Sequence, residues 1–215
     1  MPERFCYAYA YAYAYAEDPP SCSVIKKLVE FQNIHSNSGT KLRLMAGFPD
    51  NKHGSSNVKK MIPAVCNMVK AGITVVILTD LDTVECAPEM IRRWFPKKML
   101  KPEVMDGFLF RIAVREVESW LIADRHALAS SLMISKTNFS TDPDSLDDPK
   151  AHLLGIIRAK GRRTIHRQML PGSNSRIGPE YNNVLCEFIS KHWNPERAAK
   201  NSLSLFRALE ALKKI

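Results

Sequence analysis

Two acidic side chains follow a strongly apolar segment in the middle of the chain. Residues 73–78 are almost all apolar and rich in β-branched residues, and Thr79 leads from them to Asp80 and Asp82. Such a run is typical of a strand buried on both faces, and open α/β sheets bind ligands at the carboxyl ends of their strands. Carboxylates this close repel one another, which favours a hard divalent cation, Mg²⁺ or Mn²⁺, as their partner. The alternative is that Asp80 and Asp82 cap the following turn.

Further acidic residues follow two other predicted strands. Glu17 comes after the strand expected over 5–16, and it reaches the same sheet edge as Asp80 if these two strands are parallel neighbours. It is then a candidate base, whereas its ordinary interpretation is an acidic residue in the first turn of a helix. Glu116 and Glu118 follow the strand expected over 108–114. Each helical residue is rotated by about 100° from the one before, so only one of the two is expected to face a metal.

Alternating strand and helix signals must position these residues. The stretch from Tyr7 to Ala16 alternates tyrosine and alanine, a period-two pattern that predicts a strand, of which only the second half is expected to lie centrally in the sheet. The alternation predicts an α/β fold with a mainly parallel sheet flanked by helices and a helical C-terminal lobe. The other expected strands cover 41–46, 73–78 and 108–114, and the expected helices 24–31, 58–70, 116–123, 126–133, 149–159, 180–191 and 195–213.

The positive charge of the chain is concentrated in its second half. The net charge is +9, and residues 125–215 hold 15 of the 31 Lys and Arg residues but only 8 of the 22 Asp and Glu residues. We therefore expect an α/β domain over 1–125 and a basic helical lobe over 126–215 packed on it. A basic lobe beside an acidic metal site suits DNA or RNA, because phosphates attract cationic side chains. A solvated basic surface is the plainer alternative.

Several classes of protein are disfavoured by the same sequence. No apolar run approaches the ~20 residues that span a bilayer, and no signal peptide is evident, so we expect a cytoplasmic protein without a membrane partner. The five cysteines form no C-x-x-C pair, and the six histidines have no metal-ligand spacing. Phosphate-binding loops, G-x-S-x-G elbows and H-E-x-x-H pairs are absent from the sequence.

Three segments together carry a family resemblance. They are 78–82 (Leu-Thr-Asp-Leu-Asp), 111–124 (Arg-Ile-Ala-Val-Arg-Glu-Val-Glu-Ser-Trp-Leu-Ile-Ala-Asp) and 148–150 (Asp-Pro-Lys). With a strand ending in Glu17, they resemble the TOPRIM fold of topoisomerases, primases and overcoming-lysogenization-defect nucleases. More narrowly, they resemble uncharacterised bacterial TOPRIM-like proteins of the DUF4276 type.

The resemblance implies a nuclease with a TOPRIM-like, Rossmann-like domain. Glu17 would be the general acid or base, Asp80 and Asp82 would bind Mg²⁺ or Mn²⁺, and Glu118 would complete the metal shell. An association with phage defence belongs to the same implied picture. Apart from the resemblance, an ATPase subunit or a second copy of the chain is a candidate partner. Arginine binds phosphate in a bidentate manner, and the candidates for holding the nucleic acid are Arg111, Arg115, Arg162, Arg163, Arg167 and Arg176.

Two other functions fit the same residues. Asp80-Leu81-Asp82-Thr83-Val84 also matches the D-x-D-x-[TV] motif of haloacid-dehalogenase-like phosphatases, in which Asp80 would be phosphorylated and Asp82 would be the acid or base. That motif normally lies on the first strand, whereas here it follows the third. The second alternative is a non-catalytic module that binds nucleic acid or an ATPase partner through the sheet and the basic lobe.

Overall fold

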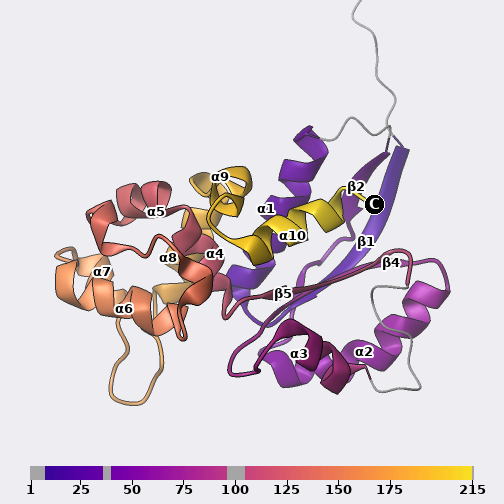
Figure 1. Ribbon diagram of the computed structural model, residues 1–215, viewed down its shortest axis with the longest axis horizontal. Coiled ribbons are helices and arrows are strands. Elements are labelled where there is room, and N and C mark those ends of the chain that lie inside the picture. The colour runs from indigo at the N-terminus through magenta and orange to yellow at the C-terminus, as the bar shows by residue number, and fades with distance from the viewer. Residues whose placement is uncertain (1–7, 36–39, 96–104, 215) are drawn as a thin grey trace, which may run out of the picture.

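A five-stranded parallel sheet forms the centre of the protein (Figure 1). The computed structural model describes residues 8–35, 40–95 and 105–214. The hydrogen-bonded order is β2-β1-β4-β5, and the short β3 also pairs with β1. The strands are β1 (Ala8–Ala16), β2 (Thr40–Leu44), β3 (Asp50–Asn51), β4 (Thr74–Asp80) and β5 (Phe108–Ala113). The predicted α/β class with a mainly parallel sheet is therefore confirmed.

The Tyr-Ala tract becomes β1 because its two residue types suit two different environments. Ala12, Ala14 and Ala16 are fully buried, and these small side chains belong to the core that α1 (Pro19–His35) packs against. Tyr15 on the opposite face is only 5% exposed, whereas Tyr11 nearer the start of the strand is 52% exposed. Only the second half of β1 pairs with β4, as the sequence predicted, and residues 5–7 of the expected strand lie outside the described residues.

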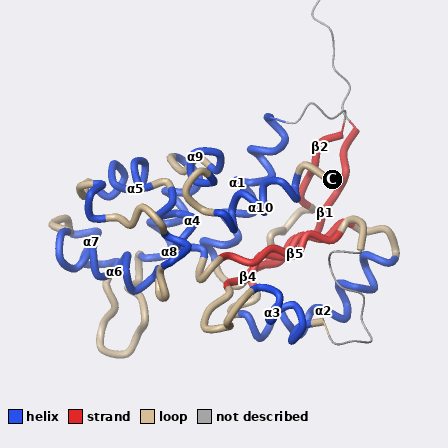
Figure 2. The backbone as a smooth tube through the Cα atoms, in the orientation of Figure 1, coloured by secondary structure: helices blue, strands red, loops and turns tan. Residues whose placement is uncertain are grey.

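Helices cover both faces of the sheet (Figures 1 and 2). The core with α1 also includes α10 (Leu203–Leu212). On the other face, β4 and β5 pack against α2 (Ser55–Lys70) and α3 (Ala87–Trp94). The apolar run of β4 is buried on both faces, since Val76 and Leu78 belong to the first core and Val75 and Ile77 to the second.

The helical C-terminal region begins directly after β5 and shares a core with the sheet. Asp124, which is buried, joins two of its helices by accepting bonds of 2.6 Å from both Nε and Nη2 of Arg197. No described helix is long and apolar enough to cross a membrane. The helices are α4 (Val117–Ala123), α5 (Arg125–Leu132), α6 (Pro149–Lys160), α7 (Thr164–Met169), α8 (Tyr181–Lys191) and α9 (Pro195–Ala199), with 3₁₀ turns at Lys136–Asn138 and Pro143–Ser145.

The helix predicted over 195–213 is wrong as a single element. It divides into α9, which ends at Ala199, and α10, which Ser202 begins: its Oγ accepts a bond of 3.2 Å from the Leu205 N–H, as an N-cap does. The short helices α3 and α7 were not predicted. With eight and six residues they span too few turns for an apolar period to stand out.

Candidate functional site

The carboxyl ends of β1, β4 and β5 meet at one edge of the sheet, beside α4. Ala16 is in register with Leu78, and Asp80 is in register with Ala113. Glu17 therefore follows its strand where Thr79 and Asp80 end theirs. The sequence placed Glu17 and Asp80 at the same edge on the condition that their strands are parallel neighbours. This condition is met, because β1 and β4 pair in parallel.

Glu17 is held against the end of β4. Its Oε1 accepts a hydrogen bond of 2.9 Å from the Asp80 N–H and another from Thr79 Oγ1. Burial raises the pKa of Glu17 from 4.5 to about 7, although these two bonds favour the charged carboxylate. The negative charges of Asp82 and Asp18 raise the pKa further. Glu17 thus exchanges its proton near neutral pH.

Asp80 lies beneath the surface at the centre of this edge. Its side chain is 5% exposed, and Oδ1 accepts a bond of 2.8 Å from the N–H of Val117 in the first turn of α4. Burial raises the pKa of Asp80 well above its ordinary value, and the nearby Glu118 and Glu17 add to the effect. A positive charge close to Asp80 would therefore strongly stabilise its charged carboxylate.

Asp82 lies at the surface and has an unusual backbone. Its φ of 49° is in the left-handed region, which few non-glycine residues adopt. The loop is fixed from the β5 side: Asp82 N–H donates to Arg115 O at 2.9 Å, and Arg115 Nη1 donates to Val84 O at 2.7 Å. Arg115 thus acts on the backbone of the acidic loop rather than pairing with Glu118.

Substitutions at Asp82 are expected to separate the effect of its backbone conformation on stability from the effect of its charge. Asn tolerates positive φ, so Asp82→Asn should leave the free energy of unfolding nearly unchanged. Valine is β-branched and disfavours this conformation, so Asp82→Val should lower the free energy of unfolding by about 1–3 kcal/mol. Urea denaturation of the two variants measures the difference. Equal stabilities would contradict the left-handed backbone at this position.

Glu118 and Glu116 share one cation, the ammonium of Lys150. Lys150 Nζ lies 3.3 Å from Glu116 Oε1 and 3.5 Å from Glu118 Oε1, and the backbone N–H of Lys150 donates to Glu116 Oε2 at 2.8 Å. Burial alone would lower the pKa of Lys150, but Glu118 and Glu116 outweigh it and raise the pKa. Of the two glutamates, Glu118 is the one whose charge acts most strongly on Asp80.

Glu118 is the most deeply buried carboxylate of the group. It is 0% exposed, and Oε1 accepts a bond of 2.9 Å from the Tyr181 hydroxyl. Its other oxygen, Oε2, is buried without a hydrogen-bond partner. Burial raises the pKa of Glu118 to about 7, against the opposing influence of Lys150. An unsatisfied buried oxygen is costly, so Oε2 is available to a cation or a water molecule.

Three members of this cluster were not predicted as site residues: Asp18, Lys150 and Tyr181. Asp18 follows Glu17 and accepts a bond of 2.8 Å from the Ser21 N–H, so it caps α1, while its charge also raises the pKa of Asp80. Asp148 and Pro149 are a helix-start signal that places Lys150 in the first turn of α6. Tyr181 carries no signal in the sequence, since only the packing of α8 against the cluster brings it there.

The raised pKa of Glu17 predicts a pH-dependent stability without metal. Below pH 4.5 the folded and unfolded states both hold the proton. Between pH 4.5 and 7 the unfolded state loses its proton first, so wild-type stability should fall as pH rises, by on the order of 3 kcal/mol from Glu17. Urea denaturation with EDTA at pH 5 and pH 8 tests this. Glu17→Gln should show a smaller fall, and an equal fall would contradict the prediction.

The six predicted phosphate-binding arginines are divided between two regions. Arg111 lies on β5, and Arg115 follows this strand and contacts the Asp82 backbone. The other four belong to α7 or the loops around it, which Figure 1 shows at the end of the helical region farthest from the sheet. These four are exposed, and they are Arg162, Arg163, Arg167 and Arg176. Their binding to nucleic acid stays a prediction.

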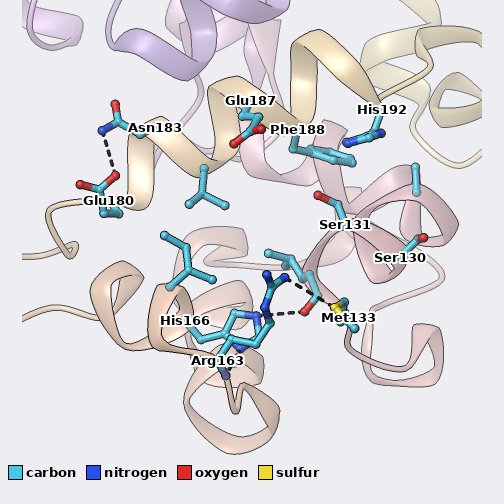
Figure 3. Close-up of a pocket in the computed structure, with 14 residues that line it drawn as sticks. Ser130, Ser131, Met133, Arg163, His166, Glu180, Asn183, Glu187, Phe188 and His192 are labelled. Carbon is cyan, nitrogen blue, oxygen red and sulfur yellow. Dashed lines mark hydrogen bonds between the residues drawn. The ribbon is translucent and has the colours of Figure 1, made fainter.

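A cavity of about 610 Å³ lies between α5, α7 and α8, within the helical region (Figure 3). Arg163 lines it from one side, with Nη1 3.5 Å from Met133 Sδ, while Glu187 lines it from α8 and His192 from just after that helix. None of the clustered carboxylates described above lines this cavity. The charged residues that line this cavity therefore lie apart from the carboxylates at the ends of the strands.

The donor chemistry of the cluster suits a hard divalent cation. Oxygen atoms of Asp80, Asp82, Glu17 and Glu118 are the ligands that Mg²⁺ prefers, and Glu118 Oε2 lacks a partner. Within residues 8–35, 40–95 and 105–214, however, no three acidic, histidine or cysteine side chains are arranged to hold a metal ion.

No family model, no curated protein and no solved structure matches this chain.

Proposed function

We propose that the protein is a metal-dependent nuclease that cleaves phosphodiester bonds of DNA or RNA at the carboxyl ends of β1, β4 and β5. The observation that supports this most strongly is the meeting of Glu17, Asp80 and Glu118, each with a raised pKa, at the edge where open α/β sheets bind ligands. The resemblance of the same segments to TOPRIM nucleases agrees with this function.

Asp80, Asp82 and Glu118, together with Glu17, are the residues proposed to hold Mg²⁺ or Mn²⁺. When bound, such an ion polarises the phosphate and lowers the pKa of a bound water. Asp80 supports this role because Oδ1 is fixed by the Val117 N–H while the carboxylate keeps a second oxygen. Asp82 is suited to binding the ion because it is exposed at the same edge and its loop is anchored to Arg115.

Glu17 is proposed to move the proton of the reaction. A group with a pKa of about 7 can take a proton from an attacking water or give one to the leaving oxygen at neutral pH. Its carboxylate is oriented by Thr79 Oγ1 and the Asp80 N–H, both on Oε1. The remaining oxygen, Oε2, is the atom at which the proton would be exchanged.

The arginines are proposed to hold the backbone of the nucleic acid. Arg115 lies beside Asp82 and Arg111 lies on β5, while Arg162, Arg163, Arg167 and Arg176 form part of the basic surface of the helical region. A polyanion contacting several of them would gain affinity through counterion release, which weakens with added salt. The phosphatase alternative is less favoured, because Asp80 as nucleophile would have to attack from a position that is 5% exposed.

Cleavage assays test the proposal directly. Plasmid DNA, single-stranded DNA and RNA are incubated with the protein and Mg²⁺ or Mn²⁺, with EDTA as one control and Asp80→Asn as another. Asparagine retains the acceptor for the Val117 N–H, so this variant should stay folded while cleavage is lost. Hydrolysis of a small phosphate ester instead would favour the phosphatase. Binding of nucleic acid or an ATPase without any hydrolysis would favour the non-catalytic module.

A further inference from the structure

The outer edge of β5 borders a groove that contains none of the proposed metal ligands. β5 runs between α10 and α3 (Figure 1), and the groove between these helices has a volume of about 440 Å³. Its floor is formed by residues of β5, including Phe110 and Ile112, and its sides by Ile91 on α3 and Ser204 on α10. The groove therefore follows the edge of the sheet rather than one of its faces.

The outward backbone groups at the bottom of this groove have no backbone partner among the described residues. Among the described residues β5 pairs with β4 alone, and the carbonyls of Gly107 and Ala113 point toward β4. Backbone groups along a strand alternate in direction, so those of Phe110 and Ile112 point the other way, into the groove. An unpaired row of N–H and C=O groups is a template for another extended chain.

The two edges of the sheet differ in how they are protected. β2, at the opposite edge, carries Lys41 and Arg43 among its five residues, and charges of this kind discourage a further strand. β5 reads Phe-Leu-Phe-Arg-Ile-Ala and has one charged residue, Arg111. A largely apolar edge strand is normally covered, so β5 is the edge at which a partner strand is expected.

The charges around the groove are of one sign. Its basic lining residues are Arg92, Arg111 and Arg207, and no acidic residue lines it. Arg207 is exposed and makes no hydrogen bond or ion pair with the described part of the chain. Glu89 pairs with both Arg92 and Arg93 and so neutralises only half of the charge at the end of α3. The groove consequently attracts carboxylates.

A second copy of this chain is a poor occupant. Pairing β5 with β5 of another molecule would bring two Arg111 side chains and two Arg207 side chains into one groove, and pairing it with β2 would add Lys41 and Arg43. Like charges placed together across an interface cost several kcal/mol, on the order of what a short strand contributes. The complementary occupant has to be acidic.

We propose that this groove, defined by β5, Arg92 and Arg207, binds an extended peptide of another protein in which apolar and acidic residues alternate. The peptide adds a strand to β5, its backbone bonds to Phe110 and Ile112, and its acidic face lies toward α10, where its carboxylates pair with Arg207. Side chains alternate across a strand, so one face of the peptide is apolar and the other acidic.

Labelled synthetic peptides test this by fluorescence anisotropy with the full chain. The probe is a seven-residue peptide in which Val and Glu alternate. There are three comparison peptides. In the first, Val alternates with Lys; the second has the composition of the probe but groups its Val and Glu residues in blocks; the third is the probe with alternate backbone nitrogens methylated. The Val-Glu probe should bind, and each of the three others should bind at least about tenfold more weakly, because they lack the charge, the alternation or the N–H donors respectively.

Variants locate the site. Arg207→Glu should weaken the Val-Glu probe at least about tenfold, while Arg158→Glu, the same exchange on the exposed face of α6 outside the groove, should not. Both positions are exposed, and circular dichroism checks the folding of each variant. Equal binding of the block-ordered or methylated peptide, stronger Arg207-dependent binding of single-stranded DNA, or dimerisation through β5 without peptide binding would overturn the proposal.

Discussion

Replacing Glu17 by glutamine is expected to slow metal-dependent cleavage by about 10²–10⁴-fold, the usual contribution of a positioned acid or base. Glutamine has the same shape, and its Oε1 can still accept the bonds from Thr79 Oγ1 and the Asp80 N–H. The substitution removes the exchangeable proton and, with it, the carboxylate charge that Glu17 contributes to the proposed metal site. The rate should be measured under saturating metal and nucleic acid, so that a change reports the chemical step.

Asp18→Asn is the matched control for Glu17→Gln. The adjacent Asp18 is also acidic, but its side chain caps α1 through the Ser21 N–H, a bond that asparagine can replace. The Asp18→Asn variant should retain the wild-type rate within about tenfold, since it loses only a charge near the cluster. The pH profile offers a second readout: the wild-type rate should change near pH 7, where Glu17 titrates, and this step should be absent from Glu17→Gln. Equal rates for the two variants would contradict the role of Glu17.

Replacing Lys150 by methionine is expected to lower the free energy of unfolding by about 3–5 kcal/mol at pH 8, as for other buried ion pairs that lose one partner. Lys150 Nζ is the cation 3.3 Å from Glu116 and 3.5 Å from Glu118, and Glu118 is fully buried. Without the ammonium, Glu118 must either remain charged in a dry site or take up a proton. Urea denaturation measures the loss.

Two comparisons test the reason for this loss. At pH 5 the loss should be smaller, because Glu118, whose pKa is already raised to about 7, then holds a proton. Adding Glu118→Gln to Lys150→Met should recover part of the stability at pH 8, and the glutamine oxygen can still accept the Tyr181 hydroxyl. A loss that is independent of pH and unchanged in the double variant would show that Lys150 acts by packing instead.

Local patterns were enough to predict four of the five described strands, all except the two-residue β3, and the meeting of Glu17 with Asp80. The apolar run of β4 and the Tyr-Ala period of β1 each specify a strand, and parallel pairing then brings their carboxyl ends together. The choice between Glu116 and Glu118 depended on more distant parts of the chain. Lys150 contacts both, and it comes from α6, whose position on α4 is a matter of tertiary packing.

The surroundings of Glu118 show why the rest of the site was not predictable. Tyr181 lies 63 positions farther along the chain, and its hydroxyl reaches Glu118 only because α8 packs beside the end of the sheet. Burial of that kind, rather than any spacing in the sequence, raises the pKa of Glu118. The left-handed backbone of Asp82 likewise lies against Arg115, which follows the neighbouring strand β5 and accepts the bond from the Asp82 N–H.

Titration of Mn²⁺ into the metal-free protein by calorimetry tests the central claim, that this cluster of carboxylates binds a divalent cation. At pH 7, in two buffers of different ionisation enthalpy, we expect saturable binding with release of protons, because Glu17 is partly protonated before the metal binds. The double variant Asp80→Asn/Asp82→Asn should lose this binding while remaining folded. Absence of binding by the wild type, or equal binding by the double variant, would contradict the account.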